Sequence, residues 1–206
     1  DIPDQSDLPA RKRQQADASR HARAVIAVNR ALKRASSPAG GEAGLADYHE
    51  AGRSPLRSDD LVDAARRWRK SPWASVYERR VPGVLSELRT RTVGISIGYL
   101  SQALSAMALA GFLREARPDL ELVAGGGLVS SWASNRRFDA RSAFGGFFDA
   151  VLPGRGEAAL AARLALGPVD PFAHAPDFSD FSALRYLAPV GVIPWNFSFG
   201  CPWKRC

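Results

Sequence analysis

The stretch Thr92-Val93-Gly94-Ile95-Ser96-Ile97 decides the fold that the sequence predicts. It is short and mostly apolar or β-branched, which is typical of a strand buried in a parallel sheet. Two similar runs follow at 120–124 and 149–152, with helical patterns over 101–117 and 157–166. This alternation of strands and helices predicts an α/β fold with a parallel sheet flanked by helices.

The residues before this core have the pattern of helices. Apolar side chains recur at helical spacing over 7–35, and two further helices are predicted over 58–69 and 74–89, with Pro82 inside the third. The segment 130–144 fits a helix or a loop. We therefore expect three parts: a helical region over 1–90 that is either separate or the truncated start of the same domain, an α/β core over 91–167, and a Pro- and Phe-rich linker over 168–206 that ends in a further strand and a cysteine-containing loop.

Small or hydroxylated residues follow each predicted strand. Ligands of parallel α/β sheets bind beyond the carboxyl ends of the strands, and glycine lets a ligand approach the main chain. Each glycine cluster taken singly also fits an ordinary tight turn, but their position at one edge of one sheet favours a shared ligand site. The candidate cofactor-binding residues are Ser96 and Tyr99 after the first strand, Gly125, Gly126 and Gly127 after the second, and Gly154, Gly156 and Glu157 after the third.

The chain carries a net charge of +7, which raises the question of nucleic-acid binding. Only four of its 28 basic residues are lysines, the basic residues are spread along the chain, and no motif with interleaved aromatic residues accompanies them. We therefore expect a solvated basic surface and regard nucleic acid as an unlikely partner. No apolar run is long enough for a transmembrane helix and no signal peptide is apparent, so the sequence predicts a cytoplasmic protein without a membrane partner.

Both cysteines, Cys201 and Cys206, lie in the last six residues. A cytoplasmic compartment is reducing, so this pair is interpreted as metal ligands and not as a disulfide. Half of a zinc site is one alternative, but it would need two further ligands.

The residues that follow the predicted strands resemble a known family. Residues 93–102 resemble the strand-to-helix segment of the cobalamin-binding domains that are fused to radical SAM enzymes, residues 118–127 and 154–157 resemble the next two loops, and residues 176–187 resemble the linker into the barrel. The resemblance is good from about residue 90 onward and loose before it. It implies a Rossmann- or flavodoxin-like cobalamin-binding fold, with the corrin over the sheet edge and the nucleotide tail toward the glycine loops, and it adds Gln102 to the candidate residues.

The terminal cysteines fit the same family. Cys201 and Cys206 are separated by four residues, a variant of the first gap in the CxxxCxxC motif that holds a 4Fe-4S cluster, and Phe199 stands where the family often has arginine. The third cysteine would lie three residues beyond Cys206, and the chain begins at Asp1 and not at Met, so we expect a fragment of a longer protein. The resemblance implies that the parent enzyme cleaves S-adenosylmethionine at the cluster, with base-off cobalamin as methyl carrier or redox partner for an unknown substrate. The fragment alone is expected to be inactive.

Two further motifs leave alternatives open. Residues 47–52 spell DxHxxG, which in many cobalamin domains supplies the lower ligand of cobalt, but no buried strand precedes His49 and a surface loop histidine is favoured. The sequence Gly94-x-Ser96-x-Gly98 is similar to the nucleophile elbow of α/β serine hydrolases, with Asp149 as acid and His174 as base. A non-catalytic nucleotide- or partner-binding module of the same fold is the third alternative.

Overall fold

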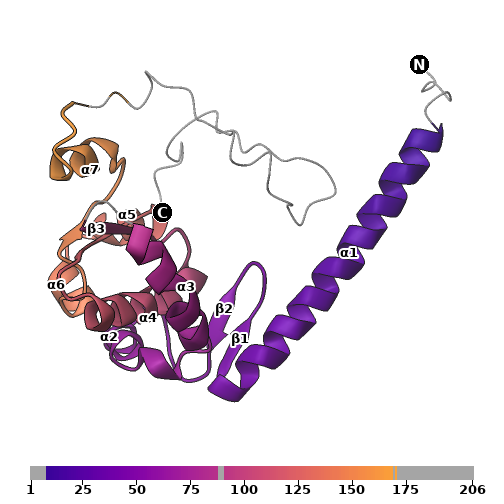
Figure 1. Cartoon of the computed structure of the whole chain (residues 1–206), viewed down its shortest axis with the longest axis horizontal. Helices are drawn as coiled ribbons and strands as arrows, with labels where there is room; N and C mark the ends of the chain where they lie inside the picture. Colours follow the sequence, from indigo (N-terminus) through magenta and orange to yellow (C-terminus); the bar gives the residue numbers. More distant parts are fainter. Residues whose placement is uncertain (1–7, 88–90, 169, 171–206) are drawn as a thin grey trace. The chain divides into compact units, whose positions relative to one another are not determined.

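The computed structural model describes residues 8–87, 91–168 and 170 (Figure 1). Residues Val28–Pro176 form one compact unit that contains the parallel sheet. Apart from residues 168 and 170, the predicted linker lies outside the described residues, and so do the strand expected near 192–198, His174, Cys201 and Cys206.

Three parallel strands form the central sheet, as the apolar runs predict. They are β3 (Thr92–Ser96), β4 (Glu121–Gly125) and β5 (Ala150–Val151), in the order β3-β4-β5. Ser96 pairs with Gly125, and Ala124 pairs with Val151. The three carboxyl ends therefore lie side by side, and the coarse prediction of an α/β fold with a parallel sheet is confirmed.

Helices follow each of these strands. They are α4 (Leu100–Ala116), α5 (Gly127–Ala133), α6 (Ala140–Phe144) and α7 (Glu157–Arg163). The ambiguous segment 130–144 contains the end of α5, a turn and α6, which begins where the Asp139 carboxylate accepts a hydrogen bond of 2.8 Å from the Ser142 amide. Helix α7 ends earlier than predicted, because Ala165 adopts a left-handed conformation with φ of 54°.

Helix α4 is the centre of the hydrophobic core. Its Leu104, Met107 and Leu113 are almost completely buried. A Cβ atom on Gly111 would lie 1.9 Å from the carbonyl oxygen of Ala65 in α2 (Ser58–Arg66), so the backbones of the two helices are in direct contact there. This close packing joins α2 to the α/β core within one unit.

The region before the sheet is mostly helical, and it also contains two short strands. It contains α1 (Leu8–Ser36), the short helices Ser37–Ala39 and Trp68–Lys70, and α3 (Ala74–Glu87), which contains Pro82. Between α1 and α2, however, β1 (Gly41–Ala43) and β2 (Tyr48–Glu50) form an antiparallel hairpin (Figure 1). Strands of three residues are too short to give a recognisable alternation of apolar and polar residues. Side chains anchor the hairpin instead: Glu50 accepts hydrogen bonds from Tyr48 and Arg53, and Arg53 also pairs with Asp63 of α2.

The net positive charge of the chain belongs to α1. This helix contains eight of the 28 basic residues and one of the 21 acidic residues. The rest of the chain therefore has 20 basic and 20 acidic residues, whose charges cancel. The net charge of the whole chain therefore says little about the charge around the strand ends.

None of the helices in the described part of the chain combines the length and the apolar composition of a membrane span.

Candidate functional site

The ends of the three strands are joined by backbone hydrogen bonds. The Ile97 amide donates to the Gly125 carbonyl at 2.7 Å, and the Ile97 carbonyl accepts from the Leu128 amide at 3.0 Å. On the other side, the Leu152 amide donates to the Ala124 carbonyl at 2.8 Å. The loops after β3, β4 and β5 are thus fixed beside one another, as the sequence analysis requires of a shared site.

Ser130 of α5 ties the second loop to the third. Its hydroxyl donates to the Gly126 carbonyl at 2.9 Å and accepts from the Gly154 amide at 2.7 Å. Gly154 is 24 residues further along the chain. Sequence reasoning missed Ser130, because nothing in a local pattern indicates a contact over that distance.

Gly126 is required by the backbone itself. Its φ of +102° is unfavourable for residues with a side chain, and a Cβ atom there would lie 2.6 Å from the Ile97 carbonyl oxygen. Gly154 also has a positive φ, of +72°, although a Cβ atom on it would meet open space. Both glycines therefore shape the loops, whatever ligand the loops bind.

A cleft of about 250 Å³ opens at these strand ends. We call it the tip cleft. It contains five of the predicted residues, namely Ser96, Gly125, Gly126, Gly154 and Gly156. The other lining residues are Gly94, Ile95, Val123, Ala124, Leu152 and Leu160. None of the residues that line it is charged, so the tip cleft suits an uncharged group with apolar faces.

The tip cleft continues onto one face of the sheet. Gly94 and Ser96 are exposed on this face, whereas Ile95 between them is buried toward the opposite side. A Cβ atom on Gly94 would meet nothing within 4 Å. Glycine inside a strand is often found where a ligand or another backbone approaches closely, so the sequence did contain a signal for Gly94.

Helix α7 covers part of this face. Its Arg163 donates a hydrogen bond of 2.9 Å from Nε to Glu121 of β4, and its Leu160 contributes to the wall of the tip cleft. Hydrogen bonds from Arg163 and Thr92 lower the pKa of the Glu121 carboxyl group below its usual value. Glu121 is therefore ionised at neutral pH, and the ion pair holds α7 at the sheet.

Four predicted residues lie outside the tip cleft. Tyr99 is 72% exposed and precedes α4. The Gln102 side-chain oxygen accepts hydrogen bonds from the amides of Gly98 and Tyr99, so its acceptor is occupied by the helix start. Gly127 is the first residue of α5, and Glu157 is the exposed first residue of α7.

The hydrolase alternative gains no support from the position of Asp149. This residue immediately precedes β5, at the end of the strand away from Ser96. Its carboxylate accepts hydrogen bonds from Arg114 at 2.6 Å and from the Leu122 amide at 2.7 Å. Asp149 therefore stabilises the opposite end of the sheet, away from Ser96.

His49 belongs to β2 of the hairpin. Its side chain is 72% exposed and lies 3.5 Å from the Asp47 carboxylate. It is not among the residues that line the tip cleft. The described residues also contain no group of three or more histidine, cysteine, aspartate or glutamate side chains that could hold a metal ion.

Comparison with known proteins identifies no relative: no family model, no curated protein and no solved structure matches the chain. The candidate site therefore has to be judged on its own geometry.

Proposed function

We propose that the unit Val28–Pro176 binds cobalamin, with the nucleotide tail of the cofactor in the tip cleft. The observation that carries the proposal is the convergence of Ser96, Gly125 and Gly154 around one uncharged cleft at the carboxyl edge of a parallel sheet. Such edges are where α/β proteins bind cofactors.

The dimensions and chemistry of the tip cleft fit the tail and not the whole cofactor. Its volume of about 250 Å³ is below the roughly 300–1,000 Å³ that sites for drug-sized ligands occupy. Within the tail, the heterocyclic base is flat, mostly apolar and uncharged, and the leucine and valine side chains of the wall suit its faces. Ser96 offers a hydroxyl group for one hydrogen bond, and Gly94 leaves room above the sheet.

We further propose that the chain is the cofactor-binding part of a radical SAM enzyme. This step depends on the resemblance of residues 90–206 and on Cys201 and Cys206, which would hold two corners of a 4Fe-4S cluster. Bound cobalamin would supply a methyl group or a redox partner to the reaction. The residues described here would contribute binding and orientation of the cofactor, so the chain alone is expected to have no turnover.

The test is retention of hydroxocobalamin through gel filtration, measured by absorbance of the protein peak. Gly94→Leu should lower retention at least ten-fold, because its side chain would enter the tip cleft without a backbone clash. Gly83→Leu is the matched control: this glycine in α3 is exposed, has open space around it and does not line the tip cleft. Gly126 is unsuitable for this test, because any side chain there would disturb the fold.

Two further ligands separate the proposal from its alternatives. Cobinamide, which lacks the nucleotide tail, should be retained much more weakly than cobalamin, and AMP should not displace cobalamin. Equal retention by wild-type protein and Gly94→Leu, or equal retention of cobinamide and cobalamin, would contradict the proposal. Displacement by AMP would favour a nucleotide-binding module.

A further inference from the structure

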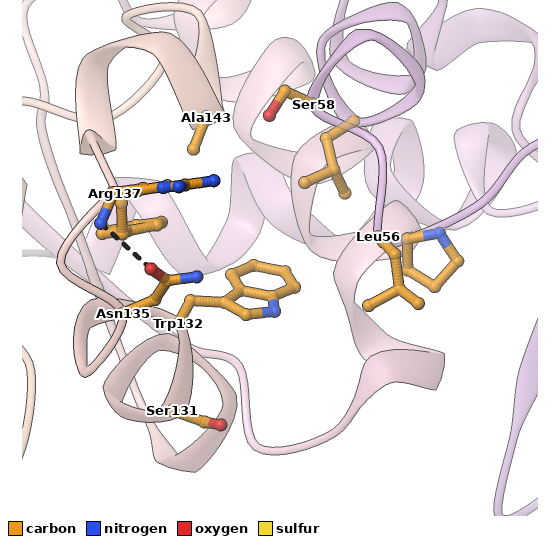
Figure 2. A pocket seen from close by; sticks show the side chains of 10 residues that line it. Leu56, Ser58, Ser131, Trp132, Asn135, Arg137 and Ala143 are labelled. Carbon is orange, nitrogen blue, oxygen red and sulfur yellow. Dashed lines mark hydrogen bonds between the residues drawn. The ribbon is translucent and has the colours of Figure 1, made fainter.

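A second pocket, of about 240 Å³, lies between the start of α2 and the turn that joins α5 to α6. Figure 2 shows its two walls: Trp132 and Asn135 on one side and Leu56 on the other, with Ser58 above. The Arg137 side chain extends over the opening between Ala143 and Trp132. None of the residues discussed for the tip cleft lines this pocket.

The Trp132 wall of this pocket packs against other aromatic rings. The ring of Trp132 packs at 6.0 Å from that of Phe144, and Phe138 meets Phe144 edge-on at 6.0 Å. Phe144 is completely buried. The indole is therefore held against the core while the side chain stays only partly buried, so it offers an apolar ring surface to a ligand.

Hydrogen bonds fix the turn that carries Arg137. The Trp132 carbonyl accepts from the Asn135 amide at 3.0 Å, and the Asn135 side-chain oxygen accepts from the Arg137 amide at 3.0 Å. The facing wall is also fixed, because the Ser54 amide donates to the Asp60 carboxylate at 2.9 Å beside Leu56. Both walls are thus formed without a ligand, which reduces the entropic cost of binding.

The pocket has one positively charged side chain in its lining. Arg137 is its only charged lining residue, and within the described part of the chain no carboxylate forms an ion pair with it. Ser58 adds a hydroxyl group and Asn135 adds an amide group. On the apolar side, Leu56 is 70% exposed at the rim, so its side chain is accessible to a ligand.

We propose that this second pocket binds a small carboxylate with an aromatic or branched apolar body. The carboxylate would accept hydrogen bonds from the Arg137 guanidinium, whose planar fork matches two carboxylate oxygens. The apolar body would lie on Trp132 and against Leu56. Neither the tip cleft nor cobalamin takes part in this binding, so the two proposals can fail separately.

The experiment uses 3-phenylpropionate as the probe and 3-phenylpropanamide as its uncharged counterpart. The readout is the indole N–H signal of Trp132 in heteronuclear NMR spectra of the full chain, assigned by a Trp132→Phe variant among the five tryptophans. We expect a saturable shift, with a dissociation constant for the carboxylate at least five-fold lower than for the amide. Five-fold corresponds to about 1 kcal/mol.

Two variants locate the effect. Arg137→Gln should remove the preference for the carboxylate, whereas Arg136→Gln should keep it, because Arg136 is a neighbour that is also exposed but does not line the pocket. An unmoved Trp132 signal, equal affinity for the acid and the amide in the wild-type protein, or an equal loss in both variants would overturn the proposal. The comparison in wild-type protein decides the case even if a variant does not fold.

Discussion

Replacing Ser130 with alanine tests whether the third strand end is tied to the other two. The change removes both side-chain hydrogen bonds of the serine, one to the Gly126 carbonyl and one from the Gly154 amide. The partners are not left isolated: the Gly126 carbonyl still accepts from the Ser130 amide at 3.0 Å, and the Gly154 residue is exposed to water. The change should therefore loosen the loop without unfolding the protein.

The expected magnitude follows from these contacts. A hydrogen bond contributes about 0.5–1.5 kcal/mol to stability. The lower end of this range applies to both bonds of Ser130, because their partners keep another hydrogen bond or contact water, so the free energy of unfolding should fall by about 1 kcal/mol. With a urea dependence of about 2 kcal/mol per molar, the midpoint should shift by about 0.5 M. Binding should also weaken, because ordering about one residue of the freed loop costs about 1 kcal/mol, or about five-fold in the dissociation constant for cobalamin.

Urea unfolding followed by circular dichroism and titration with hydroxocobalamin would measure the two effects. Ser134→Ala is the matched control, since that hydroxyl bonds only to the Ser131 carbonyl in the same helix turn. If Ser130→Ala and Ser134→Ala have the same midpoint and the same affinity, Ser130 does not hold the strand ends together and the reasoning is wrong.

Three other changes test the fold. Gly111→Ala should lower the free energy of unfolding by about 3 kcal/mol or more, because its methyl group would overlap the Ala65 carbonyl of α2, and the melting temperature should fall by at least about 6 °C; an unchanged value would contradict the close helix contact. Gly83→Ala, in an exposed turn of α3, should raise the melting temperature slightly, and a marked decrease would be unexpected. Burial opposes the ionisation of Asp149, but hydrogen bonds from Arg114 and the Leu122 amide together lower the pKa of its carboxyl group. The contribution of Asp149 to stability is therefore present above the unfolded pKa of about 3.9 and is lost as the pH falls through the folded pKa. Asp149→Asn should therefore destabilise the protein at pH 7 and less at pH 3 in urea unfolding, and an equal difference at both pH values would refute this role.

The sheet could be predicted from the sequence because its strands are short apolar runs, each followed by glycine or a hydroxylated residue. The pattern located Ser96, Gly125 and Gly154 at one edge, and in the structure Ser96 pairs with Gly125. The β1–β2 hairpin was not predicted, because hydrogen bonds of Glu50 with Tyr48 and Arg53 hold it in place and its short strands show no alternation of apolar and polar residues.

The details of the candidate site depend on contacts between distant parts of the chain. Ser130 and Gly154 meet only after β4 and β5 have paired. The hydrolase alternative shows the same limit: Ser96 and Asp149 follow one another in a suitable order, yet the register places them at opposite ends of the sheet. The open space above Gly94 depends on the face of the sheet that α7 covers, and a local sequence pattern does not predict that face.

Hydrogen–deuterium exchange of the whole chain, with and without hydroxocobalamin, tests the proposed position of the cofactor most directly. We predict slower exchange of the backbone amides after all three strands, at 96–98, 125–128 and 154–157, with little change in the β1–β2 hairpin. Exchange that is unchanged at these three loops, or slowed only elsewhere, would contradict the account.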